Sequence, residues 1–244
     1  MENLLEVPGF RRRAGRRFEP VAERSLDQEL RSLARRLPGA ENGVRVIPEF
    51  GGPNGIADLI AVTRFEPGLK RRLASGIRLI SSPIEATIVS AVPFSRTVTL
   101  QSLSKRLGIS EKQLAVVVRR LEGSAILVRS GGGYRRSNAV APIGRMYALE
   151  AKVSDWRRAM TQAVRYATWS DAVGVVLLSP PRDTTGAVSR AKALNVGLSI
   201  GGRWFVRPKI RPSHPGRRLL ASEFFVEAFT RLADSDYQSP SADA

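Results

Sequence analysis

The sequence of 244 residues contains no cysteine and a single histidine, His214. The lack of cysteine excludes disulfides, thiolate metal ligands and cysteine nucleophiles, and one histidine leaves no pair of imidazoles for a metal site. No apolar run reaches the roughly 18–20 residues that a membrane helix needs, and the N-terminal segment has no apolar core of a signal peptide. We therefore expect a cytoplasmic protein with no membrane partner.

Charge of one sign is in large excess. Lysine and arginine number 39 against 22 aspartates and glutamates, which gives a formal net charge of +17. Such an excess attracts polyanions, and nucleic acid is the commonest polyanion in a cytoplasm. The composition therefore favours a nucleic-acid partner, with a solvated basic surface or an anionic protein partner as the alternatives.

The segment 83–136 carries the signals of three helices followed by a hairpin. Gly108 is a typical residue after a helix C-terminus, and Ser110 with Gln113 forms a capping box for the third helix. The glycines at 131–133 join two short strand-like runs. The third helix has an apolar stripe with the spacing i, i+3, i+4 and i+7, formed by Leu114, Val117, Val118 and Leu121.

This order of elements resembles the winged helix-turn-helix family over the whole of residues 83–136. The resemblance implies that the third helix enters the major groove of duplex DNA and that the hairpin meets the DNA backbone. A winged helix used for protein contact or dimerisation is the alternative. The DNA-binding residues that the resemblance implies are Lys112, Gln113, Arg119, Arg120, Arg129, Arg135 and Arg136.

On both sides of this segment the pattern is that of an α/β protein. Before it we expect a helix over 22–37 and strands over 44–50 and 56–63; after it we expect strands over 145–153, 173–178, 197–200 and 204–210 and helices over 155–169, 184–194 and 219–232. We interpret the two halves as one domain interrupted by an insert. The predicted division is a basic N-terminal arm (1–20), a discontinuous domain (21–82 and 137–233), an inserted α+β winged helix-turn-helix domain (83–136) and a disordered tail (234–244).

Three charged residues stand in apolar strands of the discontinuous domain. Asp58 follows a glycine-rich turn in one strand, and Glu150 and Lys152 share a face of another because side chains alternate along a strand. Such charges are costly if they are buried without partners, and a conflict of this kind is typical of a functional site. Two carboxylates and a lysine suit metal-assisted phosphodiester hydrolysis, which needs neither histidine nor cysteine. A charged rim on an α/β sheet is the alternative.

Asp58, then Glu150-Ala151-Lys152, then a helix with Gln162 and Tyr166, resembles the PD-(D/E)XK nuclease superfamily. The resemblance implies a restriction-endonuclease-like mixed sheet core flanked by helices. It further implies that Mg²⁺ is the cofactor, with Mn²⁺ able to substitute, and that Asp58, Glu150 and the Ala151 carbonyl are its ligands. Lys152 is then the catalytic lysine, and Gln162 and Tyr166 contact the scissile phosphate or a bound water. Some members add a glutamate from the first helix, for which Glu29 is the candidate.

The sequence thus predicts a Mg²⁺-dependent DNA endonuclease in which the winged helix binds duplex DNA. One alternative is a catalytically inactive DNA-binding or regulatory protein that keeps the nuclease fold. Another is a structural protein with an anionic partner, and an RNA substrate is also open. A homodimer is possible, in which the helix predicted over 219–232 supplies the contact.

Overall fold

A computed structural model describes residues 4–6 and 20–236 of the chain. Most of the arm predicted over 1–20 and the tail predicted over 234–244 lie outside the described residues. The chain divides into two compact units. The first consists of Met1–Phe65, Gly144–Ser213 and Ala228–Ala244, and the second of Glu66–Ile143 and His214–Glu227.

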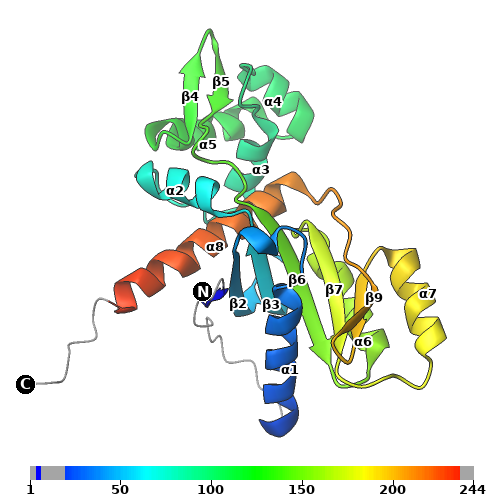
Figure 1. Ribbon diagram of the computed structural model, residues 1–244. Coiled ribbons are helices and arrows are strands. Elements are labelled where there is room, and N and C mark those ends of the chain that lie inside the picture. The colour runs from blue at the N-terminus through cyan, green and yellow to red at the C-terminus, as the bar shows by residue number, and fades with distance from the viewer. Residues whose placement is uncertain (1–3, 7–19, 237–244) are drawn as a thin grey trace, which may run out of the picture. The chain divides into compact units, whose positions relative to one another are not determined.

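The first unit is built on a seven-stranded mixed sheet with the strand order β1-β2-β3-β6-β7-β8-β9 (Figure 1). The pairs β2–β3, β3–β6 and β8–β9 are antiparallel, and the other pairs are parallel. The predicted α/β class, with a mixed sheet flanked by helices, is confirmed. The strands are β1 (Leu4–Glu6), β2 (Val44–Gly51), β3 (Ile56–Thr63), β6 (Arg145–Lys152), β7 (Ala172–Leu177), β8 (Gly197–Ile200) and β9 (Arg203–Val206).

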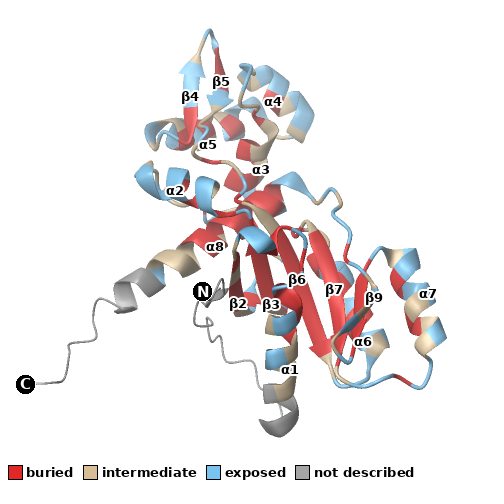
Figure 2. Ribbon diagram, viewed as in Figure 1, coloured by how far each residue is buried: buried red, intermediate tan, exposed pale blue. Residues whose placement is uncertain are grey.

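The helices of this unit are α1 (Pro20–Ala34), the short 3₁₀ helix Ala40–Asn42, α6 (Trp156–Tyr166) and α7 (Thr184–Leu194). The central strands are buried along their length (Figure 2). On one face of the sheet, Leu149 and Val176 pack with Leu30 and Leu33 of α1 in one apolar cluster. Because side chains alternate along a strand, Glu150 projects from the opposite face, where α6 packs against β6 and β7.

The second unit contains the helices and the hairpin that the sequence predicts between 83 and 136. Thr99 caps the helix α4 (Leu100–Leu107) by accepting a hydrogen bond from Ser102 N (3.2 Å). Ser110 caps the helix α5 (Glu111–Gly123) by accepting one from Gln113 N (3.4 Å). Two hydrogen bonds of 2.9 Å between Val98 and Tyr134 join the chain before α4 to the hairpin. The elements of the second unit are α2 (Glu66–Ala74), α3 (Pro83–Ala91), α4 (Leu100–Leu107), α5 (Glu111–Gly123), β4 (Leu127–Ser130), β5 (Gly133–Arg136) and the first part of α8 (Pro215–Asp236).

The second unit is larger than the insert predicted over 83–136. It begins at Glu66, because residues that the sequence analysis assigns to the discontinuous domain form α2, with Leu69 and Arg72 buried. Pro67 and Gly68 suggest a loop, yet proline is well tolerated in the first turn of a helix. The unit also takes in residues 214–227, which no local pattern links to it.

The first part of α8 contributes to the core of the second unit. Leu219 and Leu220 belong to the same buried cluster as Ile88 and Leu114. The idea that this helix supplies a dimer contact is therefore wrong for these side chains, because they are buried within the protein. Among the described residues, no helix is long and apolar enough to cross a membrane.

A buried ion pair fastens α8 to the second unit. The guanidinium of Arg72 donates to both carboxylate oxygens of Glu223 at 3.0 and 2.7 Å, and both side chains are at most 2% exposed. Arg72 also donates to the carbonyls of Ile77 and Arg78, and Glu223 accepts from Ile80 N at 2.9 Å. The pair thus holds α2, the chain after it and α8 together, and its remaining polar atoms are satisfied.

Replacing one member of this pair should destabilise the protein strongly. The Glu223→Gln substitution leaves the buried guanidinium of Arg72 without a counter-charge, and we expect a loss of about 3–5 kcal/mol of unfolding free energy. Chemical denaturation measures the loss. The matched control is Glu122→Gln, which breaks the ion pair with Arg129 (2.9 Å) in the same unit; Arg129 is 62% exposed, and the loss should be much smaller. Equal losses for the two variants would contradict the assignment.

Candidate functional site

The register between β3 and β6 brings Asp58 and Glu150 to one place. Leu59 is paired with Leu149 in an antiparallel ladder. Asp58 precedes Leu59 and Glu150 follows Leu149, so these two residues lie opposite each other on the neighbouring strands. Both side chains project from the face that α6 covers. Asp58 Oδ2 accepts a hydrogen bond of 2.8 Å from Ala151 N, which fixes the Asp58 carboxylate against the end of β6.

Three oxygens converge on the ammonium group of Lys152. Its Nζ donates to Glu150 Oε1 in a short hydrogen bond and to the Ala151 carbonyl at 2.9 Å. Nζ also lies 3.7 Å from Asp58 Oδ2. These oxygens belong to the three residues that the sequence predicts as metal ligands. In the structure, one oxygen from each of these residues lies close to the ammonium group of Lys152.

The carboxylate of Glu150 is deeply buried, with 0% of the side chain exposed. Burial raises the pKa of Glu150 above its ordinary value, and the negative charge of Asp58 raises it further. The hydrogen bonds and positive charge of Lys152 and the hydroxyl of Tyr166 act in the opposite direction. Burial and the charge of Asp58 therefore make the ionised form of Glu150 less stable, and a cation beside the carboxylate offsets part of this effect.

Tyr166 connects α6 to the same carboxylate. Its hydroxyl lies 2.8 Å from Glu150 Oε2 and 2.5 Å from the Ile56 carbonyl oxygen. A phenol has one hydrogen and can donate to only one of these oxygens at a time. When it donates to Ile56, its lone pairs face Glu150, an arrangement that a protonated Glu150 satisfies. The Tyr166 hydroxyl can therefore donate a hydrogen bond to ionised Glu150 and accept one from protonated Glu150.

The turn between β2 and β3 needs glycine to reach α6. Gly55 has φ +92° and a Cβ there would lie 3.2 Å from the ring of Tyr166; a Cβ on Gly52 would lie 2.5 Å from the ring of Trp169. Trp169 Nε1 donates to the Asn54 carbonyl at 3.2 Å. The glycine-rich turn thus packs on the end of α6 and sets the position of Asp58 three residues later.

Gln162 lies one turn before Tyr166 on α6, so the two side chains share a face of the helix. Its Oε1 is buried and has no hydrogen-bond partner within the described part of the chain. A buried amide oxygen without a donor is unusual and points to a missing polar partner. The structure therefore brings Asp58, Glu150, Ala151, Lys152 and Tyr166 together, with Gln162 on the adjoining turn of the helix.

Glu29 is not part of this group. It lies on α1, which packs against the sheet face opposite to the one that carries Glu150, and its carboxylate faces Gly202 in the β8–β9 turn. Its position beside the leucine stripe of the helix could not show which end or face of the sheet it meets. The expectation that Glu29 completes a metal site is corrected for this reason.

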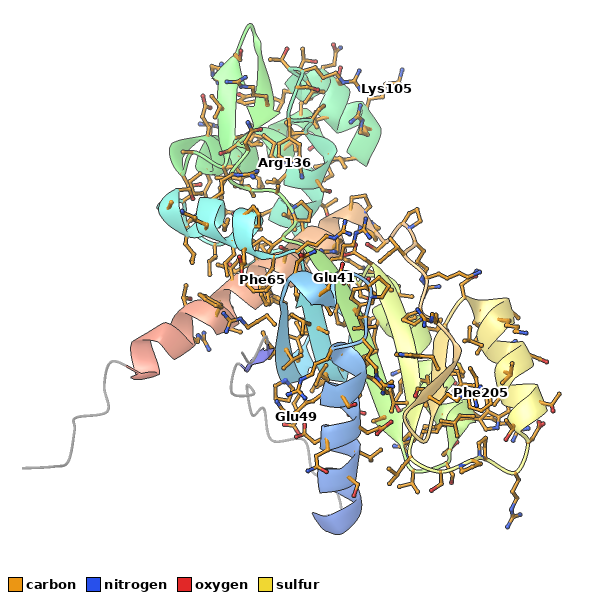
Figure 3. All side chains as sticks on the ribbon, viewed as in Figure 1. Glu41, Glu49, Phe65, Lys105, Arg136 and Phe205 are labelled. Carbon is orange, nitrogen blue, oxygen red and sulfur yellow. The ribbon has the colours of Figure 1, made fainter. Side chains whose placement is uncertain are left out.

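Glu49 lies on β2 beside the site, and it is not among the site residues that the sequence predicts. Pro48 pairs with Leu59 and Phe50 with Ala57, so Glu49 stands across from Asp58, where the ladder has a gap. Glu49 adopts φ 48°, a left-handed conformation that is strained for this residue type, and it is exposed (Figure 3). The strained residue therefore lies directly across the strand pair from Asp58.

In the second unit, α5 exposes most of the predicted DNA-binding residues. Lys112, Gln113, Arg119 and Arg120 are exposed, although Gln113 also takes part in the cap and Arg120 forms an ion pair of 3.0 Å with Glu85. A valine that the sequence pattern did not mark as a binding residue lies among them. Val116 is 61% exposed, the highest value among the exposed large hydrophobic side chains, and a position off the apolar stripe was the only signal.

The predicted contacts of the hairpin differ in their placement. Arg129 and Arg135 are exposed, and Arg129 is ion-paired with Glu122 and lies over the ring of Tyr134. Arg136 instead turns inward and stacks on Phe94, with its guanidinium carbon 3.7 Å from the ring centroid (Figure 3). Burial lowers the pKa of Arg136 to about 10. Arg136 is thus half-buried against an aromatic ring, unlike Arg129 and Arg135, and its contact with DNA stays a prediction.

The oxygen atoms around Lys152 suit a hard divalent cation. Within residues 4–6 and 20–236, no three or more histidine, aspartate or glutamate side chains gather as a metal site. A site here therefore consists of two carboxylates and the Ala151 carbonyl. Mg²⁺ is commonly held by one or two carboxylates and keeps several waters, so this donor set fits it. The convergence of these oxygens on an ammonium group shows that the place tolerates a cation.

Comparison with known proteins gives no match: no protein-family model, no curated protein and no solved structure matches the chain.

The raised pKa of Glu150 predicts a pH-dependent stability difference. Between the ordinary carboxyl pKa of 4.5 and the raised value in the folded protein, the native state binds more protons than the unfolded state. The unfolding free energy of the wild type therefore falls as pH rises through this range. Glu150→Gln removes the titration, so its stability relative to the wild type should increase with pH and then level off.

Thermal unfolding followed across pH in the presence of EDTA measures this difference. Glu66→Gln, which changes an exposed carboxylate on α2, is the control and should show no such rise. A constant offset between Glu150→Gln and the wild type over the whole pH range would contradict the prediction.

Proposed function

We propose that the protein is a metal-dependent DNA nuclease of the PD-(D/E)XK type, and that its second unit is a winged helix-turn-helix that binds duplex DNA. The observation that carries the proposal is the convergence of Asp58 Oδ2, Glu150 Oε1 and the Ala151 carbonyl on one positive charge. The order α1, β2, β3, β6, α6, β7 supports it, because the common core of the superfamily that the sequence resembles has the order helix, strand, strand, strand, helix, strand.

In this proposal Asp58, Glu150 and the Ala151 carbonyl hold Mg²⁺. When bound, the ion would supply Lewis-acid chemistry at the phosphoryl oxygen and at a water. Lys152 gives up its place among the three oxygens and turns its ammonium group toward the substrate. There it orients the attacking water and offsets the negative charge that develops on the phosphate. Tyr166 keeps Glu150 in position, and Gln162 supplies a polar contact to the phosphate or to the water.

The exposed face of α5 supports a DNA-binding function for the second unit. Lys112 and Arg119 flank Val116 on one side of the helix, at the spacing i, i+4 and i+7. Arginine and lysine contact guanine edges and phosphates in the major groove, and an apolar side chain contacts the methyl group of thymine. A mixed surface of this kind suits base reading better than a purely charged one does.

Removal of Lys152 or Asp58 should abolish cleavage and leave DNA binding intact. We expect Lys152→Ala and Asp58→Asn to lower the rate of plasmid nicking in Mg²⁺ or Mn²⁺ by at least ~100-fold. Lys192→Ala, which removes an exposed lysine of the same unit on α7, is the matched control and should keep most of the activity. Supercoiled plasmid incubated with metal or with EDTA provides the measurement.

A mobility shift without cleavage by the wild type, at every metal tested, would instead favour the catalytically inactive DNA-binding protein. In that case the ion pair of Lys152 with Glu150 is structural. Mn²⁺ titration by calorimetry separates the two readings, since only the nuclease requires a metal site that Asp58→Asn removes.

Binding to duplex DNA should depend on the exposed face of α5. The double variant Lys112→Ala, Arg119→Ala should weaken binding to a duplex in EDTA, and the slope of log K against log salt should become shallower by about two, one for each lost phosphate contact. Arg71→Ala, an exposed arginine on α2 of the same unit, should leave the slope unchanged. Fluorescence anisotropy across a salt series measures both quantities. An unaltered slope for the double variant would show that α5 does not face DNA.

A further inference from the structure

The positive charge of the first unit is concentrated in one part of its chain. Residues 156–213 contain ten arginines and lysines and only two acidic residues, Asp171 and Asp183, whereas residues 20–65 contain six basic and six acidic residues. Nine of the ten basic side chains are exposed, since only Arg211 is partly buried. The first unit therefore carries exposed basic residues of its own, in addition to those of the second unit.

Within this part of the chain, α6 lies beside the carboxylates. Its residue Tyr166 touches Glu150, with 2.8 Å between the hydroxyl and Oε2. Arg158, Gln162 and Arg165 follow the spacing i, i+4 and i+7, so they lie along one stripe of the helix that adjoins Tyr166. The helix thus presents two arginines with a glutamine between them, next to the site.

These three side chains have unmet polar capacity. Both arginines are exposed, and within the described part of the chain neither guanidinium has a hydrogen bond or an ion pair. Gln162 Oε1 is buried without a partner. Arg157, on another side of the same helix, differs: it stacks on Trp156 at 4.6 Å and lies 4.0 Å from a carboxylate oxygen of Asp183.

We propose that Arg158 and Arg165 bind the phosphodiester backbone of duplex DNA on either side of the phosphate that faces Gln162 and the carboxylates. This inference rests on the proposed function for the identity of the substrate. It assigns to the first unit a phosphate-binding surface that the DNA contacts of the second unit do not provide. A nuclease needs such contacts, because the scissile phosphate has to be held beside the metal ligands against the repulsion of Asp58 and Glu150.

The dimensions of α6 fit this assignment. A rise of 1.5 Å per residue places Arg158 and Arg165 roughly 10 Å apart along the helix axis. This distance is greater than the axial rise of about 3.4 Å between successive phosphates of one DNA strand, so the two arginines face different phosphates. Two arginines at this separation therefore reach phosphates on both sides of a central one. Arginine is well suited to the task because its planar fork matches a phosphate in geometry.

The test compares Arg158→Ala, Arg165→Ala in one double variant with Arg157→Ala as the matched control on the same helix. Binding of the full-length proteins to a short duplex is measured by anisotropy in EDTA over a salt series, where cleavage does not take place. We expect the double variant to bind roughly tenfold more weakly at 0.1 M salt, with a salt slope that is shallower by about two. Arg157→Ala should match the wild type.

Cleavage by the same proteins is then measured in Mg²⁺, together with Mn²⁺ binding by calorimetry. The double variant should show a raised KM for DNA and unchanged Mn²⁺ affinity. Normal binding and normal cleavage by the double variant would overturn the inference, as would an equal loss in Arg157→Ala. If the wild type does not cleave DNA but the double variant loses binding and salt slope, the phosphate-binding surface stands and the proposed nuclease function fails.

Discussion

The carboxylate of Glu150 is buried on one face of the sheet, where a negative charge needs a positive charge beside it. The arrangement of the site follows from this requirement. Lys152 meets it from the same face of the same strand, two residues away. Asp58 joins because its own carboxylate is fixed by the Ala151 amide. The three oxygens that stabilise the ammonium group are of the type that hard divalent cations bind in proteins. In the proposed function, the ammonium group of Lys152 and a bound metal ion would satisfy the same electrostatic requirement in turn.

The surrounding elements serve to keep this arrangement in place. The glycine-rich turn before β3 packs on Tyr166 and Trp169, and this contact sets where Asp58 begins to face β6. Tyr166 in turn reaches from α6 to Glu150. The exposed stripe of Arg158 and Arg165 is carried by the same helix, so the part of the protein that fixes the carboxylates also presents positive charge beside them. Site and proposed binding surface therefore share one rigid support.

Much of this could be predicted from local patterns, and what could not be predicted depended on contacts distant in sequence. Strand alternation placed Glu150 and Lys152 on one face, and the spacing of capping residues indicated the start of α5 at Ser110. The sheet order, by contrast, is set by pairing across the chain, and Glu29 was misplaced because a helical stripe does not reveal which face of a sheet it covers. The stacking of Arg136 on Phe94 could not be predicted, because the two residues are more than forty positions apart in sequence. The nuclease and DNA-binding functions themselves stay predictions.

The ion pair between Arg72 and Glu223 has a consequence for how the protein is made. The two residues are 151 positions apart in the chain. Ribosomes add about 5–20 residues per second, so about 8 to 30 seconds separate the synthesis of the arginine from that of its glutamate. During this interval the second unit lacks both the counter-charge for Arg72 and the leucines of α8. Although most of it is encoded in the middle of the chain, this unit completes its core only near the end of translation. For a protein that binds and cuts DNA, as proposed, the nascent chain thus acquires its full DNA-binding surface late.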